Sequence, residues 1–351
     1  MKNNTLAAVL LACLAVFGCN PRPQPTPPLV ILDTDIGSST DDLMALQMLC
    51  RYADEGRLVL LGVICDRKGA NNAMMADLLL NYYGHPECPI GIERSYDGEA
   101  KVFVDYCADK GDSSMLLHHQ KLGYKLSVSD ASSLPDGWVL YRQLLSKAPN
   151  HSVSIVSVGF LTSLSLLLNS PADSISPLTG VELVAQKVKT IYVMGSYLSR
   201  ESCCVDLDYN LSTPSADYTD SVFRLLPSGV EVVFSPSQVG QRVGRYDNDS
   251  VLADIKDHRN PIYAVYNRFH VDENQYLWDV LPVVQCIEGD DLFHLSERGR
   301  VWMSVEDGVS HLVFTPDSTG NVRFQYIPYD WSEQDSVAFR RSILNKIKET
   351  F

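Results

Sequence analysis

The feature that most constrains the fold is an alternation of short apolar runs with amphipathic stretches, which begins at Leu29 and continues to Phe234. Short apolar runs predict buried strands, and apolar residues at helical spacing predict helices. Their alternation predicts an α/β fold: an open, mostly parallel sheet with helices on both faces, whose ligands bind at the carboxyl ends of the strands. The predicted strands are 29–32, 58–64, 152–158, 188–194 and 230–234, and the predicted helices are 42–52, 72–83, 161–168 and 216–226.

The C-terminal region has a different pattern. Residues 298–305 and 321–327 alternate apolar and polar side chains, which predicts the two strands of a small antiparallel hairpin. Residues 336–350 place Phe339, Ile343 and Ile347 at helical spacing, which predicts a closing amphipathic helix. No repeat or change of composition marks a linker within residues 29–351, so we expect these residues to form one domain.

Residues 1–19 resemble the signal peptide of a bacterial lipoprotein. Lys2 precedes an apolar core that is too short to span a bilayer comfortably, and 16–19 resembles a lipobox, which is cleaved and lipidated at Cys19. An ordinary signal peptide with an incidental cysteine is the alternative. The proline-rich stretch 20–28 predicts an extended tether. We therefore expect a protein of the bacterial cell envelope, periplasmic or at the outer membrane or surface, held to the membrane only by its N-terminal lipid.

Charge and cysteine content narrow the choice of partners. The chain is 45% hydrophobic, as soluble globular proteins are, and its net charge of −14 with no basic patch argues against nucleic-acid binding. The expected partner is a small ligand or a cation. The nine cysteines have irregular spacing and form neither a disulfide framework nor a zinc pattern, so most of those after Cys19 are predicted to be buried thiols.

Four carboxylates follow the first predicted strand within ten residues: Asp33, Asp35, Asp41 and Asp42. They would repel one another unless a cation or hydrogen-bond donors compensate them. Oxygen-rich clusters of this kind suit calcium or magnesium. The alternative is a solvated acidic loop in which Thr40 or Asp41 caps the following helix. Capping accounts for one or two of the acids but not for Asp33 and Asp35 at the end of a buried strand, so the segment predicts a divalent-cation site.

This segment, 33–42, resembles the N-terminal signature of the inosine-uridine-preferring nucleoside hydrolase family, Asp-Thr-Asp-Pro-Gly-x-Asp-Asp. Further blocks resemble the family in order and spacing. Residues 158–163 resemble its Gly-Pro-Leu-Thr-Asn turn, 193–196 its Met-Gly-Gly, 208–210 its Glu-Phe-Asn and 278–279 its His-Asp. Each block alone is weak evidence, but together they span most of the mature chain. Members of the family are often dimers or tetramers, so the resemblance also raises the prospect of a homo-oligomer.

The resemblance implies calcium-dependent hydrolysis of the N-glycosidic bond of a nucleoside or related riboside, and a role in purine or pyrimidine salvage. It implies that Asp35, Asp42, Asp279 and the backbone carbonyl of Thr162 hold the calcium ion. Asp35 would also be the general base that activates water, as an oxocarbenium-like transition state requires. The resemblance further implies that Asp41 binds the ribose hydroxyls, that Asp208 and Asn210 contact the 5′ side of the sugar, that Met194 packs against the ring and that Asp33 is a buried supporting acid.

Several positions depart from the family pattern. The loop between Gly37 and Asp41 is two residues longer than usual, which makes the aim of Asp41 less certain than that of Asp42. The nearest candidate for a missing ribose-binding asparagine is Asp66. Trp278 replaces the histidine that protonates the leaving base in some members; an indole cannot act as an acid, but it can stack on a base. His270 is a candidate substitute acid, with a surface or structural histidine as the alternative.

Two other functions remain open. A non-catalytic, calcium-bearing binder of ribose or nucleosides would explain the altered sugar contacts and the missing histidine, although Asp35 argues against complete loss of activity. A phosphatase of the haloacid dehalogenase type would use Asp33 and Asp35 as nucleophile and acid. It would also need a lysine and a later acidic pair, whereas the blocks at 194–196 and 208–210 fit a nucleoside hydrolase. Only a hydrolase releases free sugar.

Overall fold

The protein is described from a computed structural model that covers residues 27–37, 39–96, 116, 119–198, 204–269, 276–306, 308–325 and 332–351. The predicted signal peptide with Cys19, nearly all of the tether, and His270 lie outside the described residues. The lipid anchor and the envelope location therefore stay predictions. No helix among the described residues is both long and apolar enough to cross a membrane.

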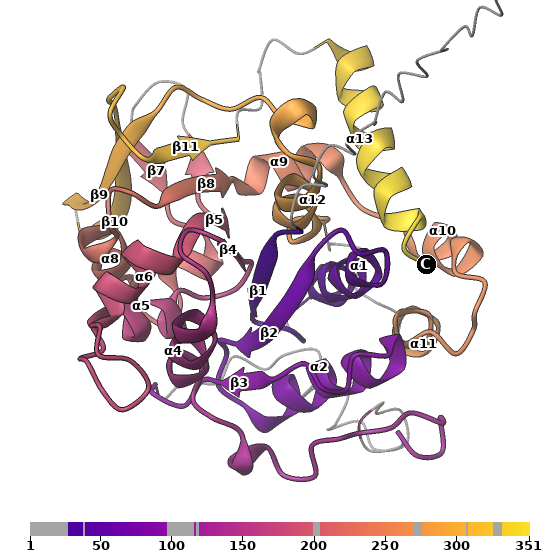
Figure 1. The fold of residues 1–351 in the computed structure, drawn as a ribbon. Helices are drawn as coiled ribbons and strands as arrows, with labels where there is room; N and C mark the ends of the chain where they lie inside the picture. The colour runs from indigo at the N-terminus through magenta and orange to yellow at the C-terminus, as the bar shows by residue number, and fades with distance from the viewer. Residues whose placement is uncertain are drawn as a thin grey trace, which may run out of the picture.

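One eleven-stranded sheet runs through the molecule (Figure 1). Seven strands lie parallel to their neighbours, and four antiparallel strands extend the sheet at one side. The parallel strands are, in spatial order, β3 (Ile90–Ile92), β2 (Val59–Cys65), β1 (Leu29–Thr34), β4 (Val153–Ser157), β5 (Val188–Met194), β8 (Glu231–Ser235) and β11 (Val322–Phe324). The antiparallel strands follow as β9 (Gly299–Glu306), β10 (Val309–Pro316), β7 (Cys204–Asp206) and β6 (Tyr197–Leu198).

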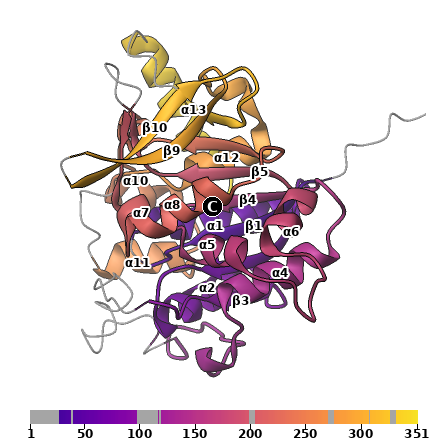
Figure 2. The same ribbon diagram turned by 90° about the vertical axis from the view of Figure 1, so that its left-hand side faces the viewer.

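Helices cover both faces of the sheet, which confirms the predicted α/β architecture (Figures 1 and 2). Each face has its own apolar core, and the central strands are apolar on both sides because both sides are covered. One face carries α1 (Asp41–Asp54), α2 (Ala70–Tyr83), α9 (Ser237–Val243), α10 (Asn248–Asp254), α11 (Pro261–Phe269), α12 (Val280–Glu288) and α13 (Glu333–Lys348). The other carries α4 (Gly137–Lys147), α5 (Thr162–Asn169), α6 (Gly180–Lys187), α7 (Tyr209–Ser212) and α8 (Ala216–Leu225).

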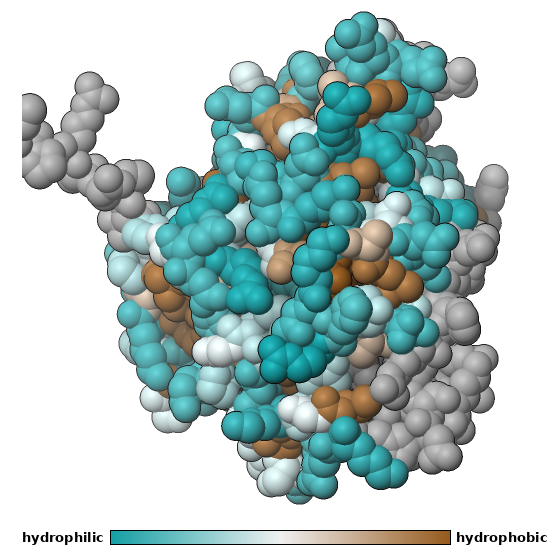
Figure 3. Space-filling model, turned by 90° about the vertical axis from the view of Figure 1, so that its right-hand side faces the viewer, coloured by the Kyte–Doolittle hydropathy of each residue, from teal (hydrophilic) through white to brown (hydrophobic). Residues whose placement is uncertain are grey.

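On the side that bears α10, α11 and α13, the described surface is mostly hydrophilic, and its apolar residues form separate small patches (Figure 3). Cys50 and Cys65 are buried free thiols, and Cys88 and Cys286 are half-buried free thiols. The prediction of buried thiols is therefore confirmed for Cys50 and Cys65.

The C-terminal hairpin is present, but its second strand is not the predicted one. β9 pairs antiparallel with β10 along its whole length, from Gly299 opposite Pro316 to Glu306 opposite Val309. β11, within the predicted strand 321–327, instead runs parallel to β8 and meets β9 only at Val322. The reason is the turn: Gly308 has φ +78°, and an Asp-Gly pair is a strong signal for a tight hairpin between the residues that flank it.

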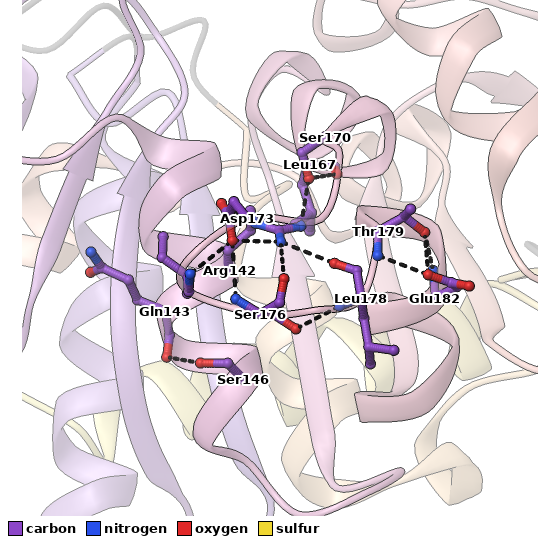
Figure 4. Close-up of polar contacts among 11 residues, drawn as sticks. Arg142, Gln143, Ser146, Leu167, Ser170, Asp173, Ser176, Leu178, Thr179 and Glu182 are labelled. Carbon is purple, nitrogen blue, oxygen red and sulfur yellow. Dashed lines mark hydrogen bonds and ion pairs between the residues drawn. The ribbon is translucent and has the colours of Figure 1, made fainter.

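A buried arginine links α4 to the connection between α5 and α6, forming what we call the Arg142 network (Figure 4). Arg142 is fully buried. Its Nε and one terminal nitrogen donate to the two carboxylate oxygens of Asp173 at 2.9 and 2.8 Å, and the other terminal nitrogen donates to Ser170 Oγ at 2.8 Å. The carbonyls of Ser176 and Leu178 accept two further bonds. All three guanidinium nitrogens therefore have acceptors supplied by the chain, as a buried charge requires.

Candidate functional site

A cavity of about 240 Å³ opens beside the carboxyl ends of the parallel strands. Parallel strands end at the same edge of a sheet, so residues that directly follow β1, β4, β5 and β8 meet there. Six of the residues singled out from the sequence line this cavity, together with Ser39, Val158, Tyr197, Tyr209 and Ser237. The six are Asp35, Met194, Asp208, Asn210, Trp278 and Asp279.

A larger cavity of about 570 Å³ lies elsewhere, between the ends of α1 and α2. Arg51, Tyr82, Lys125 and Arg259 are among its lining residues. None of the residues that the sequence singled out belongs to its lining, and the paired ions Asp257 and Arg259 occupy part of its wall. The smaller cavity is therefore the candidate site, because the predicted chemical groups converge there.

Three carboxylates form an acidic cluster at the smaller cavity: Asp41, Asp42 and Asp279. One carboxylate oxygen from each lies within 4.8 Å of the others. Asp41 and Asp42 begin α1, Asp279 directly precedes α12, and all three are buried. The solvated acidic loop considered from the sequence is therefore wrong. Helix capping does not account for the acids either, because the N-cap residue of α1 is Thr40, whose hydroxyl instead shares a 2.9 Å hydrogen bond with Tyr266.

The electrostatics of the acidic cluster favour a bound cation. Burial raises the pKa of Asp42 and Asp279 well above the ordinary value, and neighbouring carboxylates, including Asp35, raise it further. The hydroxyls of Thr34 and Ser39 donate to Asp42, and this only partly offsets the rise. A cation would relieve both the burial and the repulsion, and a set of oxygen ligands suits a hard divalent ion. The residues present therefore fit the predicted metal.

Asp41 joins two segments that are distant in the sequence. Its Oδ2 accepts hydrogen bonds from the backbone N–H groups of Trp278 at 2.7 Å and Asp279 at 3.0 Å. Its Oδ1 accepts one from the hydroxyl of Ser39. Both oxygens of Asp41 are thus engaged with the protein, and the residue is absent from the cavity lining described above. Its contact with ribose hydroxyls, implied by the resemblance, stays a prediction.

Asp33 and Asp66 lie behind the cavity as a buried pair of acids. Burial raises the pKa of Asp33 to about 7, and the Tyr141 hydroxyl, which donates to Asp33 Oδ2 at 2.6 Å, opposes this rise. Gly159 makes this packing feasible, because a Cβ there would lie 2.3 Å from Asp66 Oδ2 and 2.3 Å from the backbone nitrogen of Asp35. Asp33 is buried as expected. Its enclosure does not support a nucleophilic role in a phosphatase.

Two further assignments from the sequence stay predictions. Asp66 is fully buried and outside the cavity lining, so a ribose contact is not visible for it. Thr162 begins α5, and its hydroxyl donates to the backbone carbonyl of Asp66 at 2.9 Å. This bond places the start of α5 next to the end of β2. The binding of the metal by the backbone carbonyl of Thr162 stays a prediction.

The residues assigned to the sugar are held by hydrogen bonds to their surroundings. The Nδ2 of Asn210 donates to the carbonyl of Val158 at 2.7 Å and lies 3.3 Å from the sulfur of Met194. Asp208 is the N-cap residue of α7, where its Oδ1 accepts a bond from the N–H of Leu211 at 3.2 Å. Burial raises the pKa of Asp208, and its hydrogen bonds oppose this rise.

Aromatic side chains form much of the remaining lining. Trp278 is half-buried, and its Nε1 donates to the carbonyl of Ser237 at 2.9 Å. Tyr197 and Tyr209 also line the cavity. The sequence analysis missed these two tyrosines and Ser237. Tyr209 lies inside the 208–210 block. Ser237 follows a predicted strand, and its position after the end of that strand is the sequence signal that could have identified it.

No family model and no curated protein matches this chain. Among solved structures, the inosine-uridine preferring nucleoside hydrolase from Bacillus anthracis superimposes with a TM-score of 0.61 at 15% identity, over 91% of this chain and 99% of that one. The type III effector protein XopQ, solved in complex with adenosine diphosphate ribose, gives 0.61 at 13% identity over 93% and 94%. The plant nucleoside hydrolase PpNRh1 gives 0.57 at 17% identity over 92% and 98%.

These similarities extend over nearly the full length of both chains in each comparison, so the fold of the whole domain is shared. At these low identities, the superpositions establish a common fold. The activity has to be argued from the residues of the site. The sequence blocks that resembled the nucleoside hydrolases and the superposition of the whole chain agree: this protein has the nucleoside hydrolase fold in a divergent form.

Proposed function

We propose that the protein hydrolyses the N-glycosidic bond of a nucleoside or a related riboside in a calcium-dependent reaction that releases base and ribose. The observation that carries the proposal is the meeting of two groups of residues around one cavity. Asp279 of the acidic cluster lines it together with Asp35, and Asp208 and Asn210 line the same cavity. A metal-bearing acidic part and a polar sugar-binding part are what hydrolysis of a riboside needs.

Asp35, Asp42, Asp279 and the carbonyl of Thr162 are the proposed calcium ligands. Bound calcium would lower the pKa of a water molecule and hold two hydroxyls of the ribose. Asp35 takes the proton of the attacking water as general base. Asp41 holds Asp279 in place through the backbone N–H bonds described above.

The other lining residues orient the substrate. Asp208 and Asn210 contact the sugar, and Met194 packs against its ring. Trp278 forms a flat wall on which a base can stack, but its indole has no proton to give to a leaving base. The proposed substrates are therefore ribosides whose base can leave without a proton from Trp278. We further propose that the enzyme is anchored through Cys19 in the cell envelope and serves nucleoside salvage there.

The second candidate is a calcium-bearing binder that does not cleave its ligand. One observation favours it: among the described residues that line the cavity there is no histidine, the residue that most often acts as a general acid. The two candidates share a ligand and a metal. They differ in whether free sugar appears.

The test is release of reducing sugar from a panel of purine and pyrimidine ribosides, with calcium and with a chelator. We expect turnover with calcium, no turnover with chelator, and a loss of at least about 100-fold in Asp35→Ala, because general-base catalysis contributes on that scale. Asp249→Ala, at an exposed position in α10, is the matched control and should keep wild-type activity. Calcium-dependent binding of inosine or uridine without release of sugar would refute hydrolysis and support the binder.

A further inference from the structure

Ser237 connects two parts of the cavity that otherwise belong to different elements. It is the first residue of α9, separated from the end of β8 only by Pro236, and it is buried. Its hydroxyl donates to Asp208 Oδ2 at 2.8 Å, and its backbone carbonyl accepts from Trp278 Nε1 at 2.9 Å. One residue thus contacts both the carboxylate assigned to the sugar and the indole proposed to face the base.

The contact with Asp208 fixes the plane of that carboxylate. Asp208 Oδ1 is held by the N–H of Leu211 at the start of α7, and Oδ2 is held by Ser237 at the start of α9. The backbone groups of Ser196 and Asn210 also bind this carboxylate, and Ser237 adds a side-chain donor from α9 to them. Burial raises the pKa of Asp208, and the bond from Ser237 is the first of the contacts that oppose this rise.

The contact with Trp278 fixes the plane of the indole. Its five-membered ring lies directly against Gly240, where a Cβ would come within 2.1 Å of Cδ1 and 2.8 Å of Cγ. The hydrogen bond to Ser237 holds the same edge of the ring one turn earlier in α9. Both contacts come from α9, so the position of α9 determines the orientation of the aromatic wall.

The same turn of α9 also holds the strand that carries Tyr197. The side chain of Gln238 accepts from the N–H of Leu198 at 3.1 Å and donates to its carbonyl at 2.8 Å. The N–H of Ser237 donates to the carbonyl of Ser196 at 2.9 Å. Ser196 has φ +77°, a conformation that costs energy for a residue with a side chain and persists only where its surroundings enforce it.

We propose that Ser237 is a positioning residue that sets Asp208 and Trp278 at one fixed spacing, so that the sugar and the base of a riboside are recognised together. The proposal rests on the function proposed above. It assigns no chemical step to Ser237, whose hydroxyl acts on the substrate only through Asp208. Removing the hydroxyl should therefore break the link between Asp208 and α9, while the backbone carbonyl that holds Trp278 stays in place.

The first test needs no activity. The protein has four tryptophans, so a spectrum of the ¹⁵N-labelled indoles has few signals, and Trp278→Phe assigns the relevant one. We expect that signal to shift in Asp208→Asn, because Asp208 and Trp278 are linked through Ser237. In the Ser237→Ala background the signal should no longer respond to Asp208→Asn, whereas in the Ser237→Thr background it should still respond. Ser170→Ala is the matched control background and should keep the response, since Ser170 is a buried serine whose hydroxyl also binds a charged group, Arg142. A response to Asp208→Asn that persists in Ser237→Ala would overturn the proposal.

The second test uses turnover of a riboside. Ser237→Ala should lower kcat/KM about tenfold or more, the scale for loss of a hydrogen bond to a charged group, and Ser237→Thr should recover most of it. Adding Ser237→Ala to Asp208→Asn should cause little further loss, because Ser237 acts through Asp208. Fully additive losses would overturn the proposal. A wild-type protein that releases no sugar would instead refute the hydrolase, a result that the indole signals distinguish from failure of the Ser237 link.

Discussion

The Arg142 network and the acidic cluster are both groups of buried charges, yet the chain treats them differently. Arg142 donates five hydrogen bonds, to Asp173, to Ser170 and to two backbone carbonyls. The carboxylates of the acidic cluster face one another, and their hydrogen bonds from hydroxyl and N–H groups leave like charges side by side. A fully paired charge serves the fold, whereas an incompletely compensated set of charges is the mark of a site that an external ion completes.

The two regions also shift their pKa values in opposite directions. Hydrogen bonds from Arg142 lower the pKa of Asp173 to about 2. Burial, followed by repulsion from neighbouring carboxylates, raises the pKa of Asp42 and Asp279. The protein alone stabilises the ionised form of Asp173. The ionised forms of Asp42 and Asp279 need a nearby cation to be stable.

The largest expected effect comes from breaking the Arg142 network. Arg142→Met should lower the free energy of unfolding by about 3 kcal/mol, because it leaves a buried hydroxyl and two buried carbonyls without their donor. Urea unfolding measures the change. Arg224→Met, which removes a largely exposed arginine from α8, should change stability by no more than about 0.5 kcal/mol. Equal effects from the two variants would show that the network is not a special source of stability.

The next effect comes from filling the acidic cluster. Calcium at about 100 times its dissociation constant should stabilise the folded protein by about 2.7 kcal/mol. Thermal unfolding with calcium and with chelator measures this. Asp42→Asn should abolish the gain while leaving the metal-free protein as stable or more so, since it removes one of the repelling charges. An unaltered calcium response in Asp42→Asn would remove Asp42 from the site.

The pH dependence of stability should separate the two regions. Raised pKa values mean that the folded protein holds protons that the unfolded chain releases, so without metal the cluster and Asp33 should cost stability as pH rises from about 4 toward 7. The lowered pKa of Asp173 acts in the opposite sense: its contribution is present above about pH 4 and is lost as pH falls toward 2. Unfolding at a series of pH values with chelator tests both. A wild-type slope unaltered by Asp42→Asn between pH 4 and 7 would contradict the first part.

The smallest expected effect concerns the hydroxyl that connects the acids. Ser39→Ala removes the donor to Asp41 and Asp42 without changing any charge. We expect calcium to bind about tenfold more weakly, as is typical when a group that orients a metal ligand is lost. Calorimetric titration with calcium measures the affinity. Ser132→Ala, at an exposed site, provides the control, and equal affinities in the two variants would argue that Ser39 does not orient the acids.

The parallel part of the fold was accessible from the sequence because its signals are local. The run 188–194 was predicted with the bounds of β5, and the predicted helix 72–83 lies within α2. The helices α11 and α12 were missed, in part because Pro261 and Pro282 interrupt the apolar pattern, although proline is tolerated in the first turn of a helix. The partner of β9 was not predicted, because the Asp-Gly turn signal before Val309 is only two residues long.

The candidate site was less accessible, for a different reason. The charges and positions of the residues alone predict only the acids of 33–42 as a metal site. Asp279 is predicted only because residues 278–279 resemble a family block. Which acid holds another segment in place depends on contacts between distant parts of the chain. No local pattern shows that Asp41 would accept hydrogen bonds from two N–H groups more than 200 residues away. The roles of Ser237 and Gly240 likewise depend on how α9 lies against Trp278.

The contact of Asp41 with Trp278 and Asp279 has a consequence for how the protein is made. These pairs are separated by 237 and 238 residues, so a chain emerging from the ribosome presents its first acids long before the segment that holds them. Most of the parallel strands can assemble in that interval, but the cavity cannot close. Binding of the proposed calcium ion would therefore come late, and a nascent chain that stops short of Trp278 would carry most of the scaffold without the complete acidic cluster.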